Sequence, residues 1–333
     1  MRRHGELRFT IGDKYIATLR SLLPPIPRGF VMPLNRREAL QLASAAAIGT
    51  AINAGAFGAR AADSKPADKK FKKAVKIGMI KIEGTLLDRF KLLKELGFDG
   101  VELDAPGRAT VEEAKRCIGE TGVAVPGVVD SVHWEKRLSD PSEEVRARGL
   151  EALKSALQFC KDIGGTSVLL VPGKVTPDAT YEQCWERSIA EIKKAIPVAE
   201  ELGIQILIEN VWNDFLTDAK ETARFIDACG SKIVGAHFDI GNTVRYSPPH
   251  DWVPILGSRI KKLDIKDYKR QPEGGNLGAG FSAKLMEGDV DWPKVMAELR
   301  KISYTGWGCA EIQSGGREWL TDVASRMDKI FAS

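Results

Sequence analysis

The chain has 333 residues, of which 43% are hydrophobic and 28% are charged, with 7 Trp, 12 Phe and 5 Tyr. This composition excludes a disordered chain, a collagen-like chain and a polytopic membrane protein. The formal net charge is +4, from 49 basic and 45 acidic residues. Whether this excess indicates an anionic partner depends on where the basic residues lie.

The N-terminal part of the chain resembles a twin-arginine export signal. Arg36 and Arg37 are adjacent, an Ala-rich apolar stretch follows over residues 39–57, and Ala59-Arg60-Ala61 fits the small-x-small rule of signal peptidase. We expect Met32 to be the start of this signal and cleavage to follow Ala61, so that the protein is exported to the periplasm. Because Asn53 and several glycines interrupt the apolar stretch, a permanent transmembrane anchor is not expected.

Removal of residues 1–61 changes the charge argument. This segment holds nine of the basic and three of the acidic residues, so the remaining 272 residues carry a net charge of −2. The sequence therefore gives no basic patch that would indicate a nucleic-acid partner. We expect residues 62–74 to be a short linker and residues 75–333 to form one domain. The five cysteines include no C-x-x-C pair, so no disulfide framework is indicated.

From Val75 onward, short apolar segments alternate with amphipathic helical patterns. The expected strands are Val75–Ile80, Gly100–Asp104, Ala124–Val129, Ser167–Val171, Ile204–Glu209, Ile233–Asp239, Ile260–Lys266 and Gly306–Glu311. The expected helices are Thr85–Leu96, Thr110–Glu120, Pro141–Ile163, Tyr181–Leu202, Asp218–Ala228, Asp251–Leu256, Trp292–Ile302 and Glu318–Phe331.

Eight such units in about 260 residues predict an α/β protein with a single (β/α)8 barrel. The alternative is a doubly wound open sheet. Such a sheet usually has a Gly-rich phosphate-binding turn after its first strand, whereas Ile80-Lys-Ile-Glu-Gly84 contains one glycine.

Acidic residues fall at the ends of the second expected strand and of the fifth to eighth. They are Glu102 and Asp104, Glu209, Asp239, Asp264 and Asp267, and Glu311. The carboxyl ends of barrel strands converge on one mouth, where catalytic residues lie. Carboxylates gathered there either stay ionised beside a cation or in part take up protons. An oxygen-rich ligand set favours a hard divalent ion such as Mn²⁺ or Mg²⁺.

Several motifs at these positions resemble the xylose-isomerase-like sugar isomerases and epimerases. The motifs are Gly97-Phe-Asp-Gly-Val-Glu-Leu103, Ile208-Glu-Asn210, Asp239-Ile-Gly-Asn242, Asp264-Ile-Lys-Asp267, Glu287-Gly-Asp-Val-Asp-Trp292 and Tyr304-Thr-Gly…Glu311. The resemblance covers nearly all of residues 75–333, and its motifs are weak indicators of the substrate.

The resemblance implies a divalent ion held by Glu209, Asp239 and Glu311, with the family's histidine position falling on Asp264. Asp264 is a departure: it either ligates in place of the histidine or marks a lost or shifted metal. His237 is an alternative substitute. The resemblance also implies that Glu209 and Glu311 remove and return the proton on the carbon next to the sugar carbonyl.

Other side chains are candidates for contacts with a sugar. They are Glu102, His133, Trp134, Lys174, His237, Asn242 and Lys266. Each of them also has a structural explanation, such as a salt bridge or a packed loop.

The leading hypothesis is an exported, metal-dependent sugar isomerase or epimerase, whose partner is a small sugar or sugar derivative. A lyase or hydratase acting on a keto-sugar would use the same site. A third alternative is a carbohydrate-binding barrel without catalysis, favoured by the Asp264 departure. The sequence is compatible with a homo-oligomer.

Overall fold

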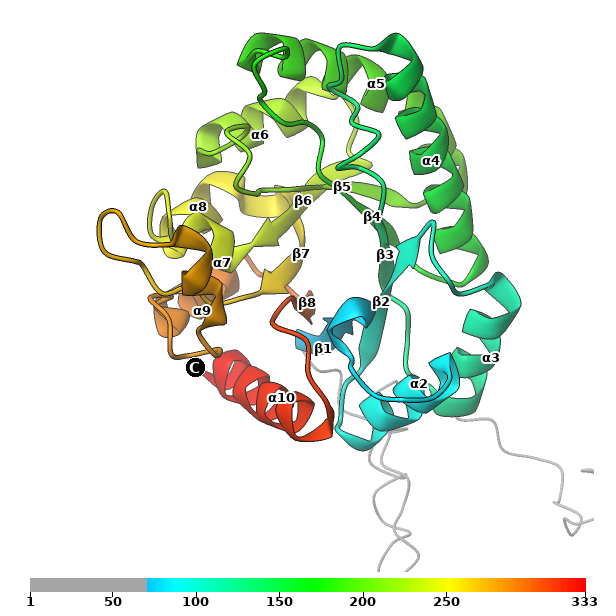
Figure 1. The fold of residues 1–333 in the computed structure, drawn as a ribbon, viewed down its shortest axis with the longest axis vertical. Coiled ribbons are helices and arrows are strands. Elements are labelled where there is room, and N and C mark those ends of the chain that lie inside the picture. Colours follow the sequence, from blue (N-terminus) through cyan, green and yellow to red (C-terminus); the bar gives the residue numbers. More distant parts are fainter. Residues whose placement is uncertain (1–70) are drawn as a thin grey trace, which may run out of the picture. The chain divides into compact units, whose positions relative to one another are not determined.

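The structure, a computed structural model, describes residues 71–333. Eight parallel strands form a closed barrel in which each strand pairs with the next along the chain and β8 pairs with β1 (Figure 1). This confirms the predicted α/β barrel. The strands are β1 (Phe71–Lys76), β2 (Gly100–Ala105), β3 (Gly127–Asp130), β4 (Ser167–Leu170), β5 (Gln205–Glu209), β6 (Val234–Asp239), β7 (Ile260–Ile265) and β8 (Gly306–Ala310).

Helices surround the barrel and bury their apolar faces against it (Figure 1). They are α2 (Leu86–Glu95), α3 (Val111–Thr121), α4 (Glu143–Asp162), α5 (Tyr181–Leu202), α6 (Ala219–Ala228), α7 (Ile240–Thr243), α8 (Pro249–Leu256), α9 (Trp292–Lys301) and α10 (Arg317–Ala332). Local sequence fixes their ends. Thr85 and Asp88 form a capping box before α2, and Gly122 ends α3 in the left-handed conformation.

Two strands start three or more residues from the predicted position, for identifiable reasons. β1 lies about four residues earlier than expected, because residues 71–75 pair with β8 and residues 77–79 form a 3-10 turn. β1 therefore overlaps the last four residues of the predicted linker 62–74. β3 begins at Gly127 rather than Ala124, because Pro126 has no N–H to donate to a ladder. Ala124 keeps only an isolated bridge to Gly100.

The predicted export signal, its cleavage site and residues 62–70 of the linker lie outside the described residues. Within residues 71–333, no helix combines the length and apolarity needed to cross a membrane. All five cysteines are buried free thiols in the structure.

Candidate active site

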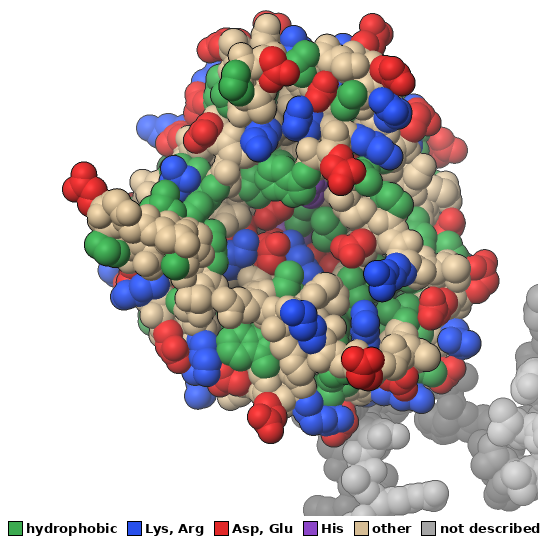
Figure 2. All heavy atoms as spheres, in the orientation of Figure 1, with side chains coloured by type: hydrophobic (Ala, Val, Ile, Leu, Met, Phe, Trp, Pro, Cys, Tyr) green, Lys and Arg blue, Asp and Glu red, His purple; other side chains and the backbone are tan. Residues whose placement is uncertain are grey.

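The carboxyl ends of the strands enclose a cavity of about 500 Å³. Figure 2 shows it as a hollow in which acidic and basic side chains gather, bordered by hydrophobic groups. The side chains and backbone that line it come from most of the strands and their following loops: Lys76, Gly78, Met79, Asp104, Val129, Ser131, His133, Trp134, Glu209, Val211, Trp212, Asn242, Lys266, Phe281 and Glu311.

Four carboxylates converge at the bottom of this cavity. Glu209, Asp239, Asp264 and Glu311 each offer an oxygen, and these oxygens all lie within 4.8 Å of one another. The first three stand at or near the carboxyl ends of β5, β6 and β7, and Glu311 follows β8 directly. The structure thus brings together all four predicted metal ligands.

Asp264 is held from two sides in the barrel interior. Its Oδ2 accepts a hydrogen bond from the ammonium of Lys76 at 2.8 Å, and its Oδ1 lies 2.9 Å from Nε2 of His237. Asp264 and His237 are completely buried, and the side chain of Lys76 is 9% exposed. Lys76 also approaches Glu311, at 3.5 Å.

A second lysine pairs with two carboxylates of the cluster. The Lys266 ammonium lies 2.8 Å from Oδ2 of Asp239 and 2.7 Å from Oε2 of Glu311. A hydrogen bond also orients the Asp239 carboxylate, because its Oδ1 accepts from the backbone N–H of Asn242 at 2.8 Å. The side chain of Asn210 accepts from the Asp239 backbone N–H at 2.9 Å.

The Glu209 carboxylate differs from its neighbours, because it has no hydrogen bond or ion pair with any described residue. Burial and, against the pull of Lys76, the neighbouring carboxylates raise its pKa well above the usual range. Burial also raises the pKa of Asp239 to about 7. Burial acts in the same direction on Glu311, but the ammonium groups of Lys76 and Lys266 outweigh it and hold the pKa of that carboxyl below its usual range.

A further ion pair lies below the cavity, inside the barrel. The Lys262 ammonium donates to Oε1 of Glu102 at 2.7 Å, and both side chains are at most 3% exposed. Although burial opposes it, the ammonium of Lys262 lowers the pKa of Glu102 to about 2. Glu102 and His237 were predicted to bind substrate, but neither lines the cavity, and both are enclosed beneath it.

The charges of this interior cluster fit a divalent cation. Five carboxylates (Glu102, Glu209, Asp239, Asp264 and Glu311) face three ammonium groups (Lys76, Lys262 and Lys266). With these groups ionised, two negative charges remain uncompensated in a buried, oxygen-rich site, which is the donor chemistry that Mg²⁺ and Mn²⁺ prefer. The unpartnered Glu209 adds an available ligand to this set.

The remaining predicted substrate contacts divide into two groups. His133, Trp134, Asn242 and Lys266 line the cavity. Burial lowers the pKa of His133 to about 4, so its ring is neutral at pH 7. Trp134 stands at the rim with 45% of its surface exposed. Lys174, by contrast, is exposed and is not among the residues that line the cavity.

Sequence reasoning missed Lys76, Trp212 and Phe281. Lys76 was hidden by the misplaced first strand: in the structure it is the last residue of β1 and pairs in register with Glu102. Trp212 follows β5 by three residues, and its indole N–H donates to the backbone carbonyl of Asn242 at 2.8 Å. Its position after a predicted strand end was the available signal. Phe281 lies in the Gly-rich segment after β7 and packs on Trp212.

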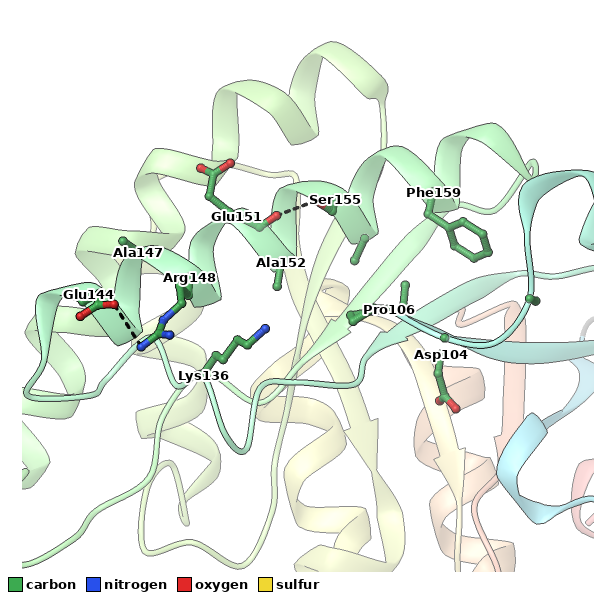
Figure 3. Close-up of a pocket in the computed structure, with 14 residues that line it drawn as sticks. Asp104, Pro106, Lys136, Glu144, Ala147, Arg148, Glu151, Ala152, Ser155 and Phe159 are labelled. Atoms are coloured by element: carbon green, nitrogen blue, oxygen red, sulfur yellow. Dashed lines mark hydrogen bonds and ion pairs between the residues drawn. The ribbon is translucent and has the colours of Figure 1, made fainter.

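A second hollow, of about 690 Å³, lies beside α4 (Figure 3). Its charged side chains do not converge: Arg148 pairs with Glu144 on the same helix, and the Lys136 ammonium points away from this pair. Asp104 points away from Pro106 and Lys136 in this view. The titratable cluster is therefore a property of the barrel mouth and not of this hollow.

Comparison with known proteins agrees with the architecture of the site. The model of the xylose isomerase-like TIM barrel family matches residues 90–330. The chain belongs to this family.

Its relatives are named as sugar epimerases. The L-ribulose-5-phosphate 3-epimerase UlaE of Escherichia coli (strain K12) is 25% identical over 255 residues, which cover 73% of this chain and 86% of the relative. UlaE of Salmonella paratyphi A is 24% identical over 259 residues, covering 74% and 89%.

Two solved structures share the fold. One is the apo 3-keto-D-glucoside 4-epimerase YcjR from E. coli, with a TM-score of 0.65, 17% identity, and coverage of 79% of this chain and 99% of that chain. The other is an L-ribulose 3-epimerase, with a TM-score of 0.66, 16% identity and coverage of 78% and 94%.

Proposed function

We propose that this protein is a carbohydrate epimerase or isomerase that removes and returns a proton on the carbon next to a sugar carbonyl. The observation that carries the proposal is the convergence of Glu209 and Glu311 on one cavity, in a barrel whose relatives are named as sugar epimerases. The reaction needs a base within hydrogen-bond reach of the carbon-bound proton, and carboxylates at a strand end supply it.

Glu209 and Glu311 have environments that suit them to different parts of proton transfer. Glu311 is flanked by two ammonium groups, which hold it as a carboxylate. Glu209 has no such partner, so its carboxyl group is free to take up and release a proton. A pair of acids in contrasting environments is the arrangement expected when one group accepts a proton and the other donates one.

Glu209, Asp239 and Glu311 are the residues that would hold a divalent cation. When bound, such a cation polarises the carbonyl and hydroxyl oxygens of a sugar and offsets the negative charge that develops on deprotonation. Lys76 and Lys266 contribute positive charge to the same cavity, and this charge offsets the repulsion between the carboxylates.

The walls of the cavity suit a sugar ring. Trp134 stands at the rim, and Trp212 and Phe281 form an aromatic wall with ring centroids 4.6 Å apart. Aromatic surfaces bury the apolar face of a small ligand, while a few fixed polar groups orient it. Asn242, Ser131 and the neutral His133 are uncharged polar side chains of the lining that suit contacts with hydroxyl groups.

Solvent deuterium exchange tests the proposal. The purified protein, with and without added Mn²⁺ or Mg²⁺, would be incubated in D₂O with free and phosphorylated aldo- and keto-sugars, followed by NMR. We expect deuterium to enter the carbon next to the carbonyl of at least one sugar, with strong dependence on the metal. A protein that binds metal but exchanges no proton with any sugar would contradict the proposal. Elimination of water from a keto-sugar would show instead that the protein is a lyase.

A further inference from the structure

The two lysines of the cavity hold the carboxylate cluster in different ways. Lys76 ends β1 and its ammonium contacts Asp264 and, more distantly, Glu311. Lys266 follows β7 and its ammonium bridges Asp239 and Glu311. A divalent cation would bind these same carboxylate oxygens. At least one ammonium group must therefore move away from them when the cation binds.

The Lys76 contact is costly to break. Asp264 is completely buried, and both of its oxygens are occupied, one by Lys76 and the other by His237. Among the described residues, Asp264 is the one hydrogen-bond partner of the Lys76 ammonium, and the more distant Glu311 is its second ion-pair partner. Removing one member of a buried ion pair leaves an uncompensated charge in a low dielectric, which is strongly unfavourable.

The Lys266 contact has an exit. Both lysines line the cavity, but the side chain of Lys266 is the more exposed, at 17% against 9% for Lys76. Two further partners stand on the cavity side: Oδ1 of Asn242 at 3.4 Å, and the ring of Phe281, with its centroid 5.2 Å from the ammonium. An amide oxygen and an aromatic face both stabilise a displaced ammonium group.

The carboxylates that Lys266 would release lie beside the unpartnered Glu209. A divalent cation that displaces Lys266 therefore gains Glu209, Asp239 and Glu311, whereas displacing Lys76 would gain Asp264 only by breaking its buried pairs. Two positive charges replace one beside Asp239 and Glu311, which favours the exchange electrostatically.

We propose that Lys266 is a displaceable counter-ion of the cation site, while Lys76 is a fixed one that withholds Asp264 from the cation. Metal binding then moves the Lys266 ammonium into the sugar cavity and leaves the contact between Lys76 and Asp264 intact. The inference rests on the metal-binding part of the proposed function and adds which carboxylates bind the cation and which lysine moves.

Amine labelling with peptide mapping by mass spectrometry tests this exchange. The protein would be labelled briefly with an acylating reagent at increasing Mn²⁺ concentration, and the modification of both lysines followed. We expect labelling of Lys266 to rise severalfold with the same midpoint as Mn²⁺ binding, and labelling of Lys76 to stay constant. A rise at Lys76, or bound Mn²⁺ with no change at Lys266, would overturn the inference and leave the proposed function standing.

Calorimetric Mn²⁺ binding gives the second measurement. Lys266→Met removes the ammonium but keeps a chain of similar length on a partly exposed position, so the fold should tolerate it. We expect about tenfold tighter Mn²⁺ binding than in the wild type. Lys269→Met is the matched control, because Lys269 pairs with Asp289 outside the cluster, and it should leave the affinity unchanged. Equal or weaker binding by Lys266→Met would overturn the inference. Absence of Mn²⁺ binding in both the wild type and this variant would overturn it together with the metal dependence.

Discussion

At the scale of single residues, the partners of a carboxylate decide what it can do. Asp264, on β7, and Glu209, on β5, are two strands apart in the chain but share one cluster. One carboxylate oxygen of Asp264 contacts Lys76 and the other contacts His237. Glu209, by contrast, forms no hydrogen bond or ion pair with a described residue. Two carboxylates at the same barrel mouth therefore differ: Asp264 has a structural role, and Glu209 is available for chemistry.

This contrast predicts the behaviour of Glu209→Gln. We expect the proton-exchange rate to fall by about 10²–10⁴-fold, the usual contribution of a general base. The fold should be retained or slightly stabilised, because the substitution removes an acid whose ionisation is opposed by burial and by the neighbouring carboxylates, and it breaks no hydrogen bond. Deuterium exchange and urea unfolding on the same sample check both parts.

Glu311→Gln serves as the comparison. It should lose exchange to a similar degree but also destabilise the fold, because Lys76 and Lys266 each lose a charged partner. If Glu209→Gln kept wild-type exchange, its assignment as a base would be wrong.

Asp130, at the end of β3, makes a prediction about pH. Burial raises its pKa to about 7, whereas an Asp in an unfolded chain has a pKa of about 3.9. Between these values the folded protein binds more protons than the unfolded chain, so the free energy of unfolding falls as the pH rises from about 4 to 7. Asp130→Asn should remove this loss, on the order of 2–4 kcal/mol.

The measurement is the urea midpoint of the wild type and of Asp130→Asn across pH 4–8. The difference between the two proteins isolates Asp130 from the other buried carboxyls. We expect the variant to be the more stable protein at pH 8 and the two to converge toward pH 4. A constant difference across the range would show that Asp130 does not titrate in this window.

At the scale of elements, an ion pair joins β2 and β7 through the barrel interior. Glu102→Met should destabilise the protein by about 3–5 kcal/mol, because it leaves the Lys262 ammonium buried without its carboxylate. Adding Lys262→Met should restore most of this loss, because the cost comes from the unpaired charge. Urea unfolding of the single and double variants measures the coupling.

An exposed pair on the outer surface provides the control. Arg317 and Glu95 form a bidentate contact between α10 and α2 in which both side chains are more than half exposed. Arg317→Met should change the stability little, because solvent screens such pairs. If Glu102→Met were as mild as this control, the interior pair would not be isolated from water.

The sequence predicted those parts of the site that follow from the strand pattern. Glu209, Asp239 and Glu311 were identified because each ends or follows a clear apolar strand, and the ends of barrel strands must meet. Lys76 was missed because the pattern of apolar residues in Val75–Ile80 predicts a strand as well as the pattern in the observed strand, Phe71–Lys76, does. Only the pairing with β8 selects residues 71–76.

Side-chain direction was the other limit of the sequence. Lys174 follows a strand closely, as the true cavity residues do, but it is exposed outside the lining. Glu102 and His237 have the parity of inward-facing residues, yet their depth in the barrel encloses them below the cavity. Parity tells which side of a strand a residue occupies, whereas depth and partners depend on the closed barrel.

At the scale of the whole molecule, we propose that the segment from Met32 to Ala61 directs export and that cleavage after Ala61 removes it. The twin arginines, Arg36 and Arg37, are the feature that such a pathway reads. Replacing both with Lys should retain the full-length chain in the cytoplasm, and cell fractionation with N-terminal sequencing would check this. Export of the Lys variant with unchanged processing would contradict the twin-arginine assignment.

The closure of the barrel predicts how far the N-terminus can be shortened. Phe71 stacks on Phe331 with ring centroids 5.3 Å apart, and its ring centroid lies 6.0 Å from that of Tyr304. Residues 71–75 pair with β8. A chain that begins at Ala62 should unfold at the same urea concentration as the full-length protein. A chain that begins at Ala74 should be markedly less stable, because β8 loses part of its partner and Phe331 loses an aromatic contact. Phe71→Ala in the chain that begins at Ala62 separates these two causes. Loss of the buried ring alone predicts a decrease of about 3–5 kcal/mol in the free energy of unfolding. Any further decrease in the chain that begins at Ala74 measures the contribution of the strand pairing. Equal stability of all these chains would place the start of the folded barrel after Phe71.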